Sequence, residues 1–228
     1  MSWVFKMLTS SLGKKLMMSL TGLFVILFLL IHLIGNLAIF KGDGGVSFNA
    51  YAKFMSTNPL IEAVSFFMYF FFILHIAVAS WITLANMMAR PVGYKSLNAS
   101  ANSSWASRNM YILGLLIFAF LFLHLKDFWW NYKIMHIDMD PDAEGNRNLY
   151  ELVIVQFKTT FGLVTYLIGL LALAYHLTHA FQSAFQTLGL DHSKYTPVIK
   201  FVGWMYAILV PIGFATMPVY VYFFPESF

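Results

Sequence analysis

Cysteine is absent from this chain of 228 residues, and charged side chains make up only 11% of it. The absence of cysteine excludes disulfides, cysteine-ligated zinc, iron–sulfur clusters bound by this chain and the covalent attachment of c-type haem. Any metal must therefore be bound through histidine, carboxylate or thioether groups. The net charge is +4, but the basic residues are spread over several short connections, so we expect no nucleic-acid partner.

Apolar residues are what the sequence has in excess. Hydrophobic residues account for 60% of the chain, and the mean hydropathy is +0.71. Soluble domains contain about 25% charged residues, so a chain of this composition cannot bury its apolar surface in a water-soluble core. The sequence therefore predicts an all-α membrane protein.

Five segments have the roughly 20 mostly apolar residues that a membrane-spanning helix needs. We expect a single integral-membrane domain that covers residues 1–228. The connections between the spans carry glycine, proline and charged residues, which favour turns. The expected spans are Lys15–Phe40, Pro59–Met88, Ser107–Trp130, Val153–Gln186 and Pro197–Phe224.

The distribution of lysine and arginine predicts how these spans cross the membrane. With the N-terminus in the cytoplasm, the inner segments hold many basic residues and Asp191 as their only acid, whereas most acidic residues fall outside. Basic residues favour the cytoplasmic side, so we expect the N-terminus inside and the C-terminus outside. The inner basic residues are Lys6, Lys14, Lys15, Arg90, Lys95, Arg108, Lys194 and Lys200.

Each of the first four spans contains a histidine deep in its apolar run, and the fifth contains none. A single membrane histidine is often explained by an interhelical hydrogen bond. One histidine on each of four successive spans is different, because ionisable groups in lipid are costly and usually mark a functional site. The four residues are His32, His75, His124 and His176.

The depth of these histidines sorts them into two pairs. Successive spans run in opposite directions, and each histidine lies at or beyond the middle of its span. His32 and His124 therefore fall in the outer half of the membrane, and the other two in the inner half. Two pairs of facing imidazoles are the axial ligands that two six-coordinate haems require. The sequence predicts that the first four spans form a haem-binding bundle, with the pairs His32/His124 and His75/His176.

A flat haem also needs space between the helices. The fourth span carries small or polar residues at intervals of three or four, which favours a cofactor slot, although such stripes are also ordinary helix-packing surfaces. The first span has a shorter version, with Gly22, Gly35 and Asn36 around its histidine. The stripe of the fourth span consists of Gly162, Thr165, Gly169, Ala172, His176, Ala180 and Ser183.

His179 lies three residues after His176, on roughly the same side of the helix. It is the alternative fourth ligand, a residue that hydrogen-bonds a neighbour, or a partner for a haem propionate or a quinone oxygen. His136 and His192 fall in expected connections, where we expect them to be solvated. Candidate neighbours of a quinone are Ser19, Thr21 and Trp81.

These residues resemble those of a known family, the cytochrome b membrane-anchor subunits of succinate:quinone oxidoreductases of the single-anchor, di-haem type. The group includes succinate:menaquinone reductases and quinol:fumarate reductases. The resemblance covers essentially the whole chain, and in the family pattern the fourth ligand is followed four residues later by a small residue, as His176 is by Ala180. The local motifs are "SLTGLFVILFLLIHL", "FILHIAV", "FLFLHL" and "YHLTHAFQSAFQTLG".

The resemblance implies an electron-transfer subunit of respiratory complex II, a succinate dehydrogenase of the tricarboxylic acid cycle, in the cytoplasmic membrane of a bacterium. A partner flavoprotein with covalent FAD oxidises succinate, and an iron–sulfur partner relays the electrons. This subunit passes them through two b haems to a quinone. The resemblance also implies that His75 and His176 bind the haem nearer the iron–sulfur subunit. The ligands of the distal haem are then His32 and His124.

One position departs from the family pattern. Some menaquinol-oxidising relatives have a glutamate two residues before the fourth ligand, where this chain has Ala174. The proton transfer that this glutamate serves in those relatives is therefore not carried over to this chain. We expect succinate oxidation with menaquinone as the acceptor. Two other functions stay open at this point: a di-haem b subunit of another respiratory complex, and a proton-coupled transporter with the histidines as a relay.

Overall fold

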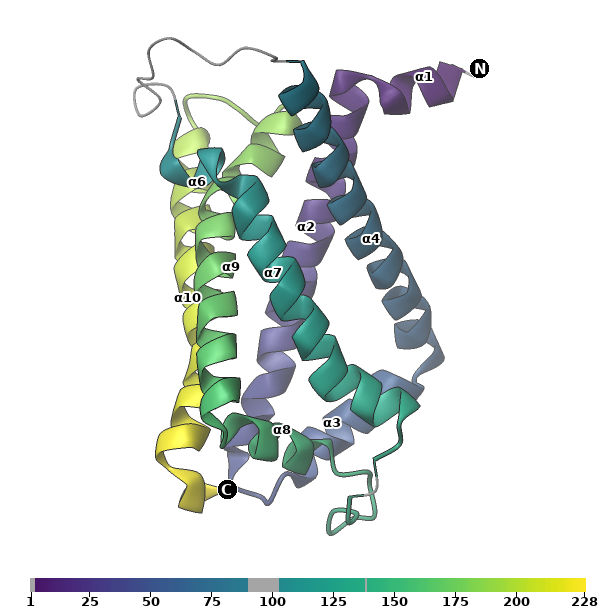
Figure 1. Cartoon of the computed structure of the whole chain (residues 1–228), viewed down its shortest axis with the longest axis vertical. Helices are drawn as coiled ribbons and strands as arrows, with labels where there is room; N and C mark the ends of the chain where they lie inside the picture. The colour runs from purple at the N-terminus through teal and green to yellow at the C-terminus, as the bar shows by residue number, and fades with distance from the viewer. Residues whose placement is uncertain (1–2, 90–102, 138) are drawn as a thin grey trace.

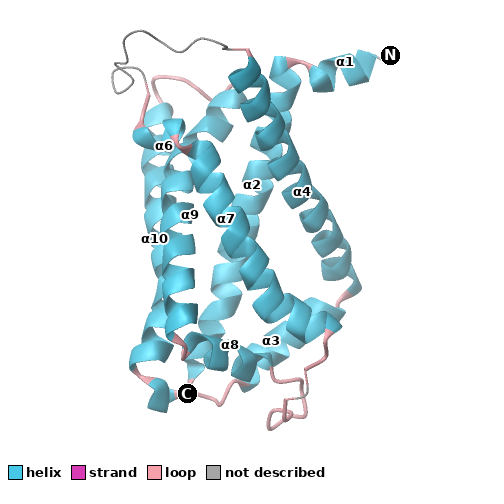
Figure 2. Ribbon diagram, viewed as in Figure 1, coloured by secondary structure: helices cyan, strands magenta, loops and turns pink. Residues whose placement is uncertain are grey.

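The structure is a computed structural model that describes residues 3–89, 103–137 and 139–228. The chain is all-helical, with 83% helix and no strand among the described residues (Figure 2). Within these described residues, five helices are long and apolar enough to cross a membrane, which confirms the expected number of spans. They are Ser11–Lys41, which begins with α2 (Ser11–Asn36), α4 (Pro59–Met88), Met110–Ile134, which begins with α7 (Met110–His124), α9 (Thr160–Thr187) and α10 (Thr196–Phe223).

Two of the spans are prolonged by tighter or wider helical turns. A 3-10 helix, η1 (Leu37–Lys41), extends α2, and a π-helix, η2 (Leu125–Ile134), extends α7. Short helices fill several connections. They are α1 (Trp3–Thr9), α3 (Val46–Thr57), α6 (Trp105–Arg108), α8 (Leu149–Phe157) and η3 (Pro225–Ser227).

The expected start of the fourth span is wrong. Val153 and its neighbours belong to α8, and α9 begins only at Thr160. Thr159 separates the two helices, because its side chain accepts a hydrogen bond from the Gly162 N–H and caps α9. The residues of α8 are apolar because Val153 and Phe157 are buried in the core, not because they cross the membrane.

The connection after the first span also holds a helix, α3, which lies across the end of the bundle that contains the C-terminus (Figure 1). Asn49 explains how α3 is held there. Its fully buried amide donates a hydrogen bond to Asn148 Oδ1 at 3.1 Å and accepts one from the Tyr150 N–H at 2.9 Å. These bonds tie α3 to the start of α8 and satisfy polar groups that burial would otherwise leave unpaired.

Burial is concentrated on one side of the bundle. Helix α9 contributes nine buried residues, whereas Val78 is the only one on α4 and Leu113 the only one on α7. In Figure 1, α9 runs alongside α10, whereas α4 diverges from both toward its lower end. The N- and C-termini lie at opposite ends, as an odd number of spans requires. Helices α2, α7 and α10 pack against α9, whereas α4 packs mainly against α2.

Gly169 allows α7 to approach α9. A Cβ at this position would lie 2.3 Å from Cγ and 2.9 Å from Cβ of Phe120, on α7. Those atoms lie close to the Phe120 backbone, so the ring cannot simply swing aside. Small residues at such crossings allow membrane helices to pack closely. On α7 itself, Gly114 faces open space, because a Cβ there would have no atom of the described residues within 4 Å.

We predict that Gly169→Ala lowers the free energy of unfolding by about 1–3 kcal/mol, because the added methyl group overpacks the α7–α9 contact. Gly114→Ala is the matched control, because its methyl group meets no neighbour and alanine favours a helix over glycine by about 0.5–1 kcal/mol. Thermal unfolding of the purified protein in detergent measures both. Equal stability of the two variants would contradict the close approach at Gly169.

Candidate functional site

The structure brings the four span histidines together as two separate pairs. The ring centroids of His32, on α2, and His124, on α7, lie 5.9 Å apart with an interplanar angle of 89°. Those of His75, on α4, and His176, on α9, lie 6.5 Å apart at 66°. The rings that face each other are those that the depth of the histidines in their spans predicts. Each pair thus joins two helices that are not consecutive spans of the chain.

Aromatic rings surround the His32–His124 pair. Phe28 stacks on His32 with centroids 5.2 Å apart, and Phe214 of α10 lies 5.5 Å from the same ring. These contacts give the pair an apolar environment that excludes water. His124 is also the last α-helical residue before the π-helix η2, and π-helical turns are frequent at functional sites. The rings around His124 belong to Phe120, Phe128 and Tyr166.

Small and hydroxyl-bearing residues of α2 flank the other pair. Thr21 Oγ1 lies 3.0 Å from His75 Nδ1, and a Cβ at Gly22 would lie 3.4 Å from Cε1 of the same ring. Ser19 donates a hydrogen bond to the Ala184 carbonyl oxygen of α9 at 2.6 Å. Helix α2 therefore contacts both helices that carry the His75–His176 pair.

Three of the four rings have a polar partner at Nδ1. Besides Thr21 at His75, the Tyr166 hydroxyl lies 3.1 Å from His124 Nδ1 and Asn36 Nδ2 lies 3.3 Å from His32 Nδ1. No Nε2 atom of these three rings makes a hydrogen bond among the described residues. In metal sites the ring nitrogen that does not bind the metal is usually held by a hydrogen bond. The hydroxyl oxygens at His75 and His124 can accept a proton from Nδ1, which leaves Nε2 of those two rings available to a ligand, whereas the Asn36 amide can only donate to His32.

His176 Nδ1 is buried without a hydrogen-bond partner within the described part of the chain. An unsatisfied buried polar group costs about 1–3 kcal/mol, and no described side chain fixes the tautomer of His176, so either of its ring nitrogens is open to a bound group. The separation of the rings also fits a bound group. Metal–nitrogen bonds of about 2 Å on both sides of one ion, together with the size of two imidazole rings, place the ring centroids about 6 Å apart.

The donor set is restricted to two nitrogens per site. Residues 3–89, 103–137 and 139–228 contain no group of three or more histidine, aspartate or glutamate side chains placed to hold a metal ion. Two opposed imidazoles supply two axial ligands and leave the equatorial positions to another molecule. A tetrapyrrole provides four nitrogens in that plane, so the residues present fit a haem.

The small-residue stripe of the fourth span is divided between two roles. Its first part serves helix packing, because Gly162 lies at the capped start of α9, Gly169 accommodates Phe120, and Ala172 is buried. On α2, the space at Gly35 is taken by the ring of Tyr51. The stripe as a whole is therefore not a slot, and only the part near His176 and the residues beyond it stays a candidate.

The other histidines lie apart from these pairs. His179 is half-buried on α9, one turn beyond His176, and has no hydrogen bond or ring contact with any described residue. It does not face a second span histidine, so the geometry favours His176 as the partner of His75. His136 and His192 are exposed in connections, as expected, and His192 stacks on Tyr195.

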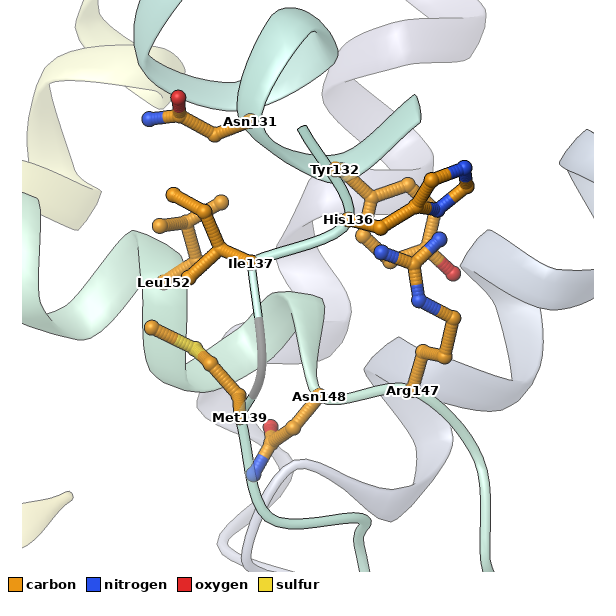
Figure 3. Close-up of a pocket in the computed structure, with 8 residues that line it drawn as sticks. All are labelled: Asn131, Tyr132, His136, Ile137, Met139, Arg147, Asn148 and Leu152. Carbon is orange, nitrogen blue, oxygen red and sulfur yellow. The ribbon is translucent and has the colours of Figure 1, made fainter. Parts of the chain in front are cut away.

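A separate cavity of about 290 Å³ lies beside the connection between η2 and α8 (Figure 3). The Arg147 guanidinium lies 4.3 Å from the centroid of the Tyr132 ring at its edge. No residue of either histidine pair lines this cavity, so it is not part of the candidate site. Its lining residues are Asn131, Tyr132, His136, Ile137, Met139, Arg147, Asn148 and Leu152.

The side chains that hold the rings in place are not evident from the sequence. The sequence pattern does not single out Tyr166, and it indicates Thr21 only as a neighbour of a quinone, together with Ser19 and Trp81. The structure places Thr21 on His75, Ser19 in a bond between α2 and α9, and the Lys14 ammonium group 4.5 Å from the Trp81 ring. The sequence signal that could have indicated these contacts is a hydroxyl group inside an apolar span, because a buried hydroxyl requires a hydrogen-bond partner.

No protein-family model, no curated protein and no solved structure matches the chain. The class of protein therefore rests on the geometry alone. The described part of the chain is helical and contains five candidate membrane spans. Its first four spans each contribute one ring to two facing histidine pairs.

Proposed function

We propose that the chain is a di-haem membrane cytochrome b whose first four spans bind two b haems. The observation that carries the proposal is the facing pair of imidazoles, which occurs twice, at ring separations of 5.9 Å and 6.5 Å. A haem bound by two axial histidines supplies reversible one-electron transfer.

The residues of the chain hold and shield the two sites. His32 and His124 present one pair of nitrogens, and the aromatic rings around them exclude water. His75 and His176 present the second pair. Helix α2 supports both pairs, because it carries His32 and contacts His75 through Thr21.

Within this class we assign the chain to the membrane anchor of a succinate:quinone oxidoreductase. The support is the resemblance of the four histidine motifs and of the span layout to that family, with five spans and a histidine-free fifth span. In this role, electrons from a flavoprotein with FAD reach the chain through an iron–sulfur subunit at the end nearer His75 and His176. They leave to a quinone, with menaquinone as the expected acceptor. The N-terminus faces the cytoplasm of a bacterium.

We predict that the purified protein gives a reduced-minus-oxidised b-type absorption spectrum with two haems per chain, because each histidine pair holds one. Haem quantification against protein concentration measures the ratio. A flavoprotein that copurifies would support the assignment to succinate:quinone oxidoreductase over another respiratory complex. Well-folded protein without haem would contradict the proposal and would favour the histidine-relay transporter.

We also predict that His176→Ala loses one haem per chain, because His75 then has no opposing nitrogen. His179→Ala is the matched control, one turn away on the same helix, and it should retain both haems. The two variants are compared by haem content and by the amplitude of the b-type spectrum. Retention of both haems in His176→Ala with loss of one in His179→Ala would reassign the ligand.

A further inference from the structure

Thr21 is a hydroxyl residue buried inside an apolar span, with only 3% of its surface exposed. Its Oγ1 donates a hydrogen bond to the Met17 carbonyl oxygen at 2.7 Å, and the Met18 carbonyl oxygen lies 3.2 Å away. A hydroxyl group has one proton, so this proton is used within α2. The lone pairs of Oγ1 remain to accept a hydrogen bond.

The remaining neighbour of Oγ1 is His75 Nδ1, at 3.0 Å. Since Oγ1 can only accept there, the proton of this bond must lie on Nδ1. A neutral imidazole with its proton on Nδ1 has a free lone pair on Nε2. Thr21 thus selects the one neutral tautomer of His75 that can bind a metal through Nε2.

Tyr166 occupies the corresponding position at the other pair. It is 5% exposed, and its hydroxyl lies 3.1 Å from His124 Nδ1. Each hydroxyl residue contacts one histidine pair but lies on a helix that carries a histidine of the other pair. Thr21 contacts His75 and shares α2 with His32, and Tyr166 contacts His124 and shares α9 with His176. Separations of 11 and 10 residues correspond to about 15 Å along each helix, at about 1.5 Å per residue.

We infer that Thr21 is a positioning residue for the His75–His176 site: its hydroxyl fixes the tautomer and the orientation of the His75 ring and raises the basicity of Nε2. The inference rests on the proposed function for its redox consequence, but not for the hydrogen bond itself. Hydrogen-bond acceptors at the second ring nitrogen make a histidine a stronger metal ligand. Tyr166 gives the chain a second hydroxyl contact at the other site, against which the effect of Thr21 can be compared.

The first test is a redox titration of the full complex, followed at the b-type absorption band. In Thr21→Val, one of the two haem waves should move to higher potential, because a less basic ligand stabilises the oxidised iron less. The same haem should be retained about 10- to 100-fold more weakly. Thr21→Ser keeps the hydroxyl group and should restore both properties. Tyr166→Phe should change the other wave only.

The second test reads the hydrogen bond directly. Solid-state ¹⁵N NMR of the full chain in lipid bilayers should show His75 protonated at Nδ1, with its N–H proton at a chemical shift typical of a hydrogen bond. In Thr21→Val this proton signal should move to lower chemical shift, and in Thr21→Ser it should stay. The measurement does not require haem, so it separates a failure of this inference from a failure of the proposed function.

An unprotonated Nδ1 in His75, or an identical signal in wild type and Thr21→Val, would overturn the inference even if both haems are present. Unchanged haem waves in Thr21→Val would also overturn it. A chain that binds no haem but shows the expected NMR shifts would retain the hydrogen bond and the tautomer and would overturn only their redox role.

Discussion

Placing imidazole rings in an apolar helical bundle constrains the rest of this structure, because each ring has two nitrogens and the surroundings offer few polar partners. An unsatisfied polar group in such surroundings costs free energy. The chain meets this constraint at Nδ1 for three rings, with a threonine, an asparagine and a tyrosine. It brings the rings together in opposed pairs, so that a single bound group can satisfy the remaining nitrogens of both.

Helix α9 makes this arrangement possible because it is the most buried of the spans and supports parts of both sites. Tyr166 reaches the His32–His124 pair from one half of the helix, and His176 belongs to the second pair in the other half. The packing that holds α9 in place includes the contact of Gly169 with Phe120, whose ring also lies beside His124, and the contact of Phe181 with Gly203 of α10. Tight packing in α9 therefore coexists with helices α4 and α7 that bury little surface of their own.

Much of the fold and of the two histidine pairs could be predicted from the sequence, for physical reasons. Long apolar runs specify spans. Because successive spans run in opposite directions, the depth of His32 or His75 within its span indicates which other histidine lies at the same level. The start of α9 could not be predicted, because Val153 and Phe157 are as apolar in the core as they would be in lipid. The contacts of Thr21 and Tyr166 could not be predicted either, since they depend on how helices rotate against each other, which side-chain packing decides.

The cross-connection between the two sites has a consequence for electron transfer under the proposed function. Thr21 and His32 lie on one continuous helix, and so do Tyr166 and His176 on a helix that runs in the opposite direction (Figure 1). A helix is stiff along its axis because every turn is hydrogen-bonded, so neither site can shift along the membrane normal without displacing a contact at the other. Two antiparallel helices thereby fix the distance between the two sites. A fixed spacing is what a chain that passes electrons from one site to the next requires.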